Sequence, residues 1–213
     1  MPLHAVFLIG FMGSGKTTLG KKLAAKLNWK FIDLDEAVRV EHGAESVAAL
    51  IKDKGFDFFR QAEGEMLKSL SLENVVVSTG GGTPCYFDNL EWMKGSGVVV
   101  FLDVDEGMLY SRLVKELDLQ TTDDGRRTTD DDEKNKTKNI SGEDSEFRIQ
   151  NSEFKISNRP LLEGLDEDGL KEFIRKTLQE RMPFYGQADI VFRPSDERIE
   201  GLVREIRRFG EIS

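Results

Sequence analysis

Cysteine and histidine are scarce in this 213-residue sequence, which has one cysteine and two histidines, and its 30 lysines and arginines are outnumbered by 39 acidic residues. The single Cys85 excludes an internal disulfide, and His4 and His42 are too isolated to form a metal site. A net charge of −9 argues against a general nucleic-acid binder, which normally has a basic face. No stretch approaches the roughly eighteen apolar residues of a membrane span. We therefore expect a cytoplasmic protein with neither nucleic-acid nor membrane partners, and a monomer.

Short apolar runs alternate along the chain with segments whose apolar residues have helical spacing. The expected strands are Ala5–Ile9, Lys30–Asp33, Val75–Ser78, Val98–Leu102 and Ile190–Phe192, and the expected helices are Lys16–Leu27, Asp57–Leu70, Glu106–Leu117 and Glu167–Met182. Short Val-rich strands between helices are typical of buried parallel strands joined by right-handed crossovers. The pattern predicts one α/β domain over residues 1–213, a three-layer α/β/α sandwich with a five-stranded parallel sheet.

Residues 118–158 interrupt this rhythm. They begin with a long polar stretch and end in a tandem heptad, SEFRIQN followed by SEFKISN. Such a composition buries too little apolar surface to offset the entropy cost of ordering, so we expect a mobile insertion in a surface loop. The heptad pair is either a docking segment or a duplication without function. A calcium loop is not expected in the acidic run, because Gln120 stands where the first ligand should be.

The sequence GFMGSGKT at residues 10–17 satisfies the G-x-x-x-x-G-K-[ST] pattern between an expected strand and an expected helix. Glycines let successive backbone N–H groups surround a phosphate, Lys16 reaches the β- and γ-phosphates, and Thr17 can ligate Mg²⁺. A dinucleotide fingerprint fails, because Thr18 stands where its last glycine should be. We therefore predict a nucleoside triphosphate site rather than a simple glycine turn. Its expected contacts are Gly13, Ser14, Gly15, Lys16, Thr17 and Thr18.

Further candidates follow the second and third strands. Asp33 and Asp35 share one face at a strand end, where they either face a ligand crevice or cap the next helix. Arg60 and Glu63 are three residues apart on a helix, and they form either a surface pair or a carboxylate grip with its orienting partner. The glycines at 80–82 would let the backbone lie flat against a small substrate.

Together these motifs resemble the shikimate kinases, small relatives of the nucleoside monophosphate kinases. The resemblance is carried by GFMGSGKTT, D-x-D at 33–35, FRxxE at 59–63, GGG at 80–82, RPLL at 159–162 and ERxPxY at 180–185, in order over most of residues 5–193. It implies a P-loop fold and transfer of the ATP γ-phosphate to the 3-hydroxyl of shikimate, giving shikimate 3-phosphate and ADP on the way to chorismate and the aromatic amino acids.

The resemblance also implies roles for individual residues. Asp35 is the implied base and contacts the reacting diol, while Lys16 and Arg159 stabilise the transferring phosphoryl group. The implied substrate contacts are Asp35, Arg60, Arg181, Gly80, Gly81 and Gly82, with Glu63 orienting Arg60. Thr17, together with Asp33 through water, is the implied Mg²⁺ site. The 118–158 insertion would enlarge the family's lid, and Arg112 is our candidate for covering the adenine, followed by Arg193 and Pro194.

Two other functions compete with this interpretation. A gluconate kinase would share the P-loop and the acidic second strand, but the GGG turn and the paired Arg60 and Arg181 argue against it. A nucleotide-binding regulatory module with a disabled lid would need no aspartate on the acceptor side. The combination of Lys16, Asp35 and Arg159 therefore favours a kinase.

Overall fold

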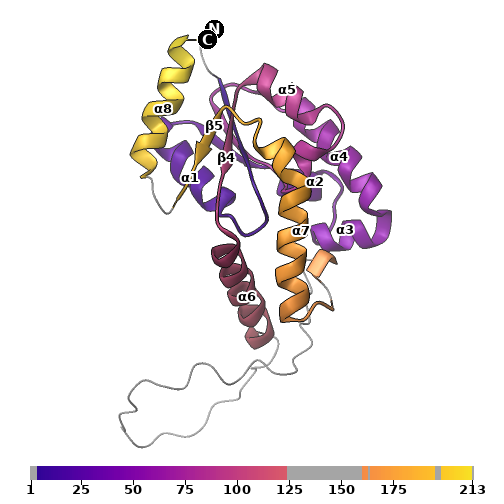
Figure 1. Cartoon of the computed structure of the whole chain (residues 1–213). Coiled ribbons are helices and arrows are strands. Elements are labelled where there is room, and N and C mark those ends of the chain that lie inside the picture. The colour runs from indigo at the N-terminus through magenta and orange to yellow at the C-terminus, as the bar shows by residue number, and fades with distance from the viewer. Residues whose placement is uncertain (1–3, 124–159, 163, 195–197, 213) are drawn as a thin grey trace, which may run out of the picture.

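The computed structural model describes residues 4–123, 160–162, 164–194 and 198–212, and its centre is a parallel sheet of five strands (Figure 1). The strands are β1 (Ala5–Ile9), β2 (Lys30–Asp33), β3 (Val75–Ser78), β4 (Val98–Leu102) and β5 (Ile190–Phe192). They lie side by side in the order β2-β3-β1-β4-β5, and every pairing is parallel. All five strand predictions and the predicted fold class are confirmed.

Eight α-helices and two 3₁₀ turns join the strands among the described residues. The helices are α1 (Lys16–Leu27), α2 (Leu34–Glu41), α3 (Val47–Lys54), α4 (Phe56–Ser69), α5 (Asn89–Ser96), α6 (Glu106–Asp123), α7 (Glu167–Tyr185) and α8 (Ile199–Ile212), and the 3₁₀ turns are η1 (Thr83–Cys85) and η2 (Pro160–Leu162). The predicted helix at 16–27 is confirmed to the residue, and that at 57–70 is shifted by one. The helices beginning at 106 and 167 continue beyond their predicted ends, and α2, α3, α5 and α8 are not among the predicted helices.

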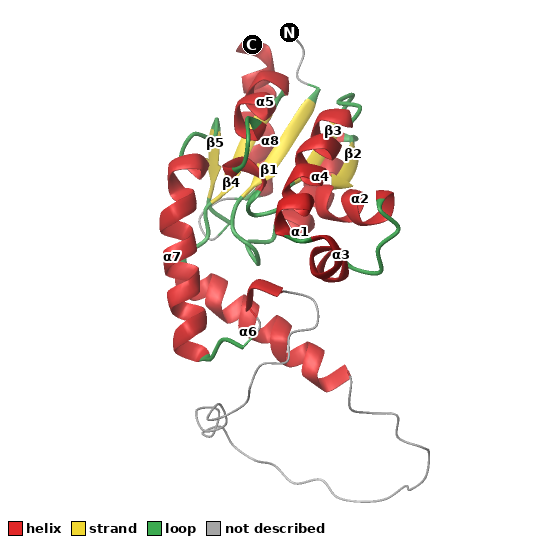
Figure 2. Ribbon diagram, turned by 90° about the vertical axis from the view of Figure 1, so that its right-hand side faces the viewer, coloured by secondary structure: helices red, strands yellow, loops and turns green. Residues whose placement is uncertain are grey.

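The sheet is buried on both faces, which makes this a three-layer molecule (Figures 1 and 2). Phe7 and Ile9 of β1 pack with side chains of α5, α6 and α7, whereas Val6 and Leu8 point to the opposite face, toward α1 and α8. Strands covered on both sides cannot alternate apolar with polar residues, so β1, β3 and β4 are nearly continuous apolar runs.

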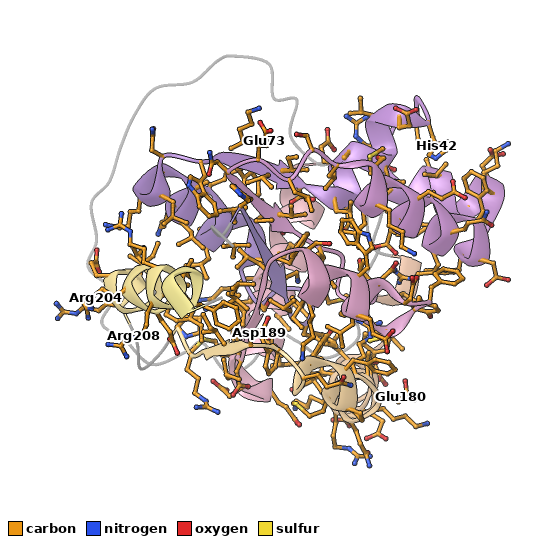
Figure 3. All side chains as sticks on the ribbon, turned by 90° about the horizontal axis from the view of Figure 1, so that it is seen from above. His42, Glu73, Glu180, Asp189, Arg204 and Arg208 are labelled. Carbon is orange, nitrogen blue, oxygen red and sulfur yellow. The ribbon has the colours of Figure 1, made fainter. Side chains whose placement is uncertain are left out.

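Helix α8 covers the sheet with one apolar stripe. Leu202 and Ile206 are buried against the sheet, while Arg204 and Arg208 project outward from the helix (Figure 3). This division is the usual one for a helix on the surface of a globular protein.

A second, smaller core lies among α2, α3 and α4. Its buried members are Val38, Leu50, Phe59 and Ala62. These helices lie between Leu34 and Ser69, and residues of α3 and α4 line a cavity that is described below.

The predicted insertion at 118–158 lies mostly outside the described residues. Its first six positions belong to α6, which continues to Asp123. Helices α6 and α7 lie side by side, and α6 extends beyond the edge of the sheet at which the strands end (Figures 1 and 2). In the part of the chain that the structure describes, no helix combines the length and hydropathy needed to cross a membrane.

Candidate active site

The loop between β1 and α1 has the geometry of a phosphate-binding loop. Gly10, Gly13 and Gly15 have φ values of 144°, 74° and 97°, which side-chain-bearing residues rarely adopt. The buried Lys16 donates from Nζ to the carbonyl oxygens of Gly10 and Phe11, each at 2.9 Å. The lysine side chain therefore lies back along its own loop.

A cavity of 430 Å³ opens on one side of this loop. Its lining is Gly13, Ser14, Gly15, Thr18, Leu19, Lys22, Leu102, Arg112 and Pro194. Arg112 lies at its edge, where Nη1 donates to the carbonyl oxygens of Ser14 at 2.7 Å and Gly13 at 3.3 Å. Arg193 instead pairs with Asp103 at 2.8 Å, and it is not among the lining residues. Lys22, which was not predicted, adds a positive charge to the cavity.

Of the two roles considered for Asp33 and Asp35, Asp33 caps the next helix, whereas Asp35 and not Asp33 lines the cavity described below. One Asp33 oxygen accepts from the backbone N–H of Glu36 at 3.4 Å and caps α2, while the other accepts from the Thr17 hydroxyl at 2.8 Å. The Thr17 hydroxyl also lies 3.5 Å from that of Ser78, at the end of β3. Ser78 was not predicted, because a serine that ends a buried strand carries no distinctive signal.

These oxygens fit the chemistry of magnesium. Mg²⁺ prefers hard oxygen ligands and usually keeps several waters and phosphate oxygens, so one carboxylate and one hydroxyl are a sufficient protein contribution. No group of three or more His, Cys, Asp or Glu side chains suited to a metal occurs among the described residues. A metal held by protein ligands alone is therefore not indicated there, whereas an ion shared with phosphates is compatible with Thr17 and Asp33.

Asp35 follows β2 in the first turn of α2, and its Oδ1 atom is buried without a hydrogen-bond partner. Burial raises the pKa of this carboxyl from 3.8 to about 7, and repulsion from Glu63 and Asp33 adds to the effect. The positive charges of Lys16 and Arg60 act in the opposite direction. Near neutral pH the carboxyl is therefore poised between its proton-accepting and its neutral form, as a general base requires.

Arg60 and Glu63 on α4 form an ion pair inside the protein, so a surface pair is excluded. Glu63 is completely buried and Arg60 is 9% exposed. The Arg60 guanidinium lies 4.9 Å from the ring centre of Tyr86 and 5.5 Å from that of Phe59, and its Nε atom is buried without a partner. The second Glu63 oxygen accepts from the Thr83 hydroxyl at 2.6 Å.

The three glycines at 80–82 allow these charged groups to approach the backbone closely. A β-carbon at Gly80 would lie 2.3 Å from a Glu63 oxygen and 2.7 Å from Asp35 Oδ1. A β-carbon at Gly82 would lie 2.8 Å from the centre of the Arg60 guanidinium. Any side chain at Gly80 or Gly82 would therefore displace the ionisable groups that the site assembles.

Arg181 reaches the same region from α7. Its Nη1 atom would lie 3.1 Å from a β-carbon at Gly81, and its guanidinium is 5.9 Å from the ring centre of Phe11. Tyr185, one turn later, donates to the Gly81 carbonyl oxygen at 2.5 Å. No carboxylate of the described ranges forms an ion pair with Arg181, in contrast to Arg60.

These groups surround a cavity of 340 Å³ beside the P-loop. The polar part of its lining is Asp35, Arg60, Gly80, Gly81, Gly82, Glu116 and Arg181, and the apolar part is Met12, Val47, Ile51, Phe56, Phe59 and Leu161. Every predicted acceptor residue therefore lines one cavity. Arg159 lies outside the described residues. The apolar wall and Glu116 were missed, because ordinary helical residues do not reveal which cavity they will face.

Comparisons with known proteins agree on one family. A family model described as "Shikimate kinase" matches residues 12–153. A curated shikimate kinase from Bacteroides thetaiotaomicron is 36% identical over 213 residues, covering 97% of this chain and 98% of the relative. One from Bacteroides fragilis is 36% identical over 208 residues, covering 95% of this chain and 94% of the relative.

Solved structures show the same likeness. The crystal structure of shikimate kinase from Bacteroides thetaiotaomicron superposes with a TM-score of 0.68 at 33% identity, covering 97% of this chain and 98% of that one. Shikimate kinase from Acinetobacter baumannii, solved in complex with shikimate, has a TM-score of 0.70 at 24% identity and covers 97% of this chain and 92% of its own. The second likeness supports the fold alone.

Proposed function

Because this chain belongs to the shikimate kinase family, we propose that it transfers the γ-phosphate of ATP to the 3-hydroxyl of shikimate, giving shikimate 3-phosphate and ADP. The observation that best supports this proposal is a single cavity that brings Asp35 together with Arg60 and Arg181. A carboxyl whose pKa is raised to about 7 and two guanidinium groups line this cavity, which suits an acceptor that carries both a hydroxyl group and a carboxylate.

The reaction needs a group that takes the proton of the attacking hydroxyl, and we assign this role to Asp35. The 3-oxygen forms a bond to the γ-phosphorus, the bond between that phosphorus and the β,γ-bridging oxygen breaks, and ADP leaves. The proton passes to the Asp35 carboxylate. A pKa near 7 supports this assignment, because it matches the group to proton transfer at neutral pH.

Arg60 and Arg181 are proposed to bind the acceptor carboxylate. Glu63 already compensates the charge of Arg60, so we assign the charge interaction to Arg181, which pairs with no carboxylate of the described residues, and a directed hydrogen bond to Arg60. Two guanidinium groups with these roles support an anionic acceptor. This arrangement also explains how an acidic protein accommodates one, since Arg60 and Arg181 lie together in one small cavity.

The P-loop amides, Lys16, Thr18 and Arg112 are proposed to hold the nucleotide, with its base in the 430 Å³ cavity and its phosphates along the loop. Mg²⁺, held by Thr17 and through water by Asp33, would offset phosphate charge when bound. Arg159 remains a proposed contact of the transferring phosphoryl group. Activity as a cytoplasmic monomer is also proposed, because one chain supplies both cavities.

A kinase acting on another sugar acid and a non-catalytic nucleotide sensor are the alternatives. The test measures ADP release with ATP and Mg²⁺, with shikimate, gluconate or no acceptor, for the wild type and the variants Asp35→Asn and Asp53→Asn. Asp53 has a side chain that is 70% exposed, on α3. We expect shikimate-dependent turnover that is lost in Asp35→Asn and kept in Asp53→Asn.

The proposed Mg²⁺ site is tested by chelation and by a matched pair of variants at Thr17. Chelation of Mg²⁺ should stop turnover, and Thr17→Val should impair it far more than Thr17→Ser, which keeps the hydroxyl. ATP binding without turnover of any acceptor would refute the kinase function, and turnover of gluconate alone would refute the choice of acceptor.

A further inference from the structure

The turn after the three glycines, residues 83–88, contacts the buried Arg60–Glu63 pair twice. Thr83 hydrogen-bonds to Glu63, and the Tyr86 ring faces Arg60. We propose that Thr83 and Tyr86 are positioning residues that aim Arg60 at the acceptor carboxylate. The inference rests on the proposed function and extends it, since neither residue is among the cavity-lining residues.

Thr83 acts on Arg60 through Glu63. One Glu63 oxygen accepts from Arg60 Nη1 and the other accepts from the Thr83 hydroxyl at 2.6 Å, so the carboxylate is held at both ends. Thr83 and Glu63 both have 0% exposure, so water cannot replace the hydroxyl. Without it, a buried carboxylate oxygen would lose its donor and the carboxylate would turn, carrying Arg60 with it.

Tyr86 acts on Arg60 directly. Its ring centre lies 4.9 Å from the guanidinium carbon, within the range of a cation–π interaction. The ring and the Glu63 carboxylate together restrict the guanidinium. Arg60 lines the cavity, so this restriction fixes the direction in which its guanidinium meets a ligand there.

A hydrogen bond and an ion pair connect the turn to neighbouring helices, as a positioning role requires. The Asn89 side chain donates to the Thr83 carbonyl oxygen at 3.1 Å, and Asp88 pairs with Lys68 on α4. Phe87 has a φ of 53°, an uncommon conformation for a bulky residue, although its side chain is 69% exposed. Such a conformation persists only where neighbouring contacts enforce it. The turn is therefore joined to α5 through Asn89 and to α4 through Lys68.

The experiment compares shikimate with its neutral carboxamide as acceptors. Both retain the hydroxyl groups, but only the acid has the carboxylate that Arg60 is aimed at. The variants are Thr83→Val, which removes the hydroxyl at nearly constant shape, with Thr83→Ser as its control, and Tyr86→Leu with Tyr86→Phe as its control. KM and kcat are measured for each acceptor and for ATP, together with Tm.

For Thr83→Val we expect the KM for shikimate to rise about tenfold, as for loss of one hydrogen bond to a charged group, with the KM for ATP unchanged. The KM for the carboxamide should rise much less, so the preference of the enzyme for the acid over the carboxamide should shrink. Thr83→Ser should restore this preference. Tyr86→Leu should show the same pattern more weakly, and Tyr86→Phe should match the wild type.

An equal rise in KM for shikimate and for its carboxamide would overturn the proposal, because a merely structural defect affects both acceptors alike. Unchanged KM values for shikimate in Thr83→Val and Tyr86→Leu would also overturn it. If Thr83→Val does not fold, the partly exposed Tyr86 decides the question. Absence of shikimate-dependent turnover in the wild type is a separate outcome, which refutes the proposed function instead.

Discussion

Replacing Asp35 with asparagine should stabilise the protein at alkaline pH while it abolishes turnover. Burial, followed by repulsion from Glu63 and Asp33, raises the pKa of this carboxyl from 3.8 to about 7. Above pH 7 the folded protein must therefore hold a poorly solvated carboxylate that the unfolded chain exposes to water. Such a pKa difference corresponds to about 4 kcal/mol between the protonation states.

The sign of the effect follows from the raised pKa. The folded state favours the protonated carboxyl, so wild-type stability from Asp35 is complete below about pH 4 and is lost as the pH rises through 7. The asparagine variant does not ionise. Its buried amide also needs hydrogen-bond partners, which offsets part of the gain. We therefore expect the free energy of unfolding at pH 8 to exceed that of the wild type by about half of the maximum, roughly 2 kcal/mol.

The assay is thermal unfolding of the wild type and Asp35→Asn at pH 5 and pH 8. For a chain of this length, 2 kcal/mol raises Tm by about 4–8 °C, and we expect this gain at pH 8 and little gain at pH 5. The exposed Asp53→Asn is the control and should show no such dependence on pH. An equal Tm change at both pH values, or a lower Tm at pH 8, would refute the reasoning.

Three further predictions concern activity. The kcat/KM for shikimate should rise about tenfold per pH unit below pH 7 and level off above it, because only the Asp35 carboxylate accepts a proton; a flat profile from pH 5 to 8 would contradict this role. Gly80→Ala should lower kcat/KM by at least about a hundredfold, because its β-carbon would lie 2.3 Å from a Glu63 oxygen; near-normal kinetics would show that the site tolerates the displacement. Arg181→Lys keeps the charge but loses the planar fork, so the KM for shikimate should rise about tenfold while that for ATP holds; calorimetric titration checks the binding step.

The strand boundaries and the phosphate-binding loop could be predicted because their causes are local. β1 and β4 are buried on both faces, which leaves a continuous apolar run that is visible in the sequence. The loop glycines are required by backbone conformation, so their spacing alone identifies them. The short α5, in contrast, has only Leu90 and Met93 as large buried residues, too few to establish a helical period.

The acceptor site could be predicted only in part. Its arginines, aspartate and glycines were found because each belongs to a recognisable motif, and the structure brings the described ones to a single cavity. Thr83 and Tyr86 carry no such signal. A threonine and a tyrosine in a turn acquire a role only when the turn packs against α4, twenty residues earlier in the chain.

The sequence by itself determined the order of the strands along the chain, the loop that binds phosphate and the identity of the charged groups. Only the tertiary structure decided which charges are buried. From the sequence alone, Arg60 and Glu63 could equally form a surface pair, and Asp33 and Asp35 could equally be helix caps. The pKa of a carboxyl and the energy of an ion pair depend on how much water packing removes from around the charged groups. Here that packing brings together α2, α4 and the glycine turn, which come from separate parts of the chain.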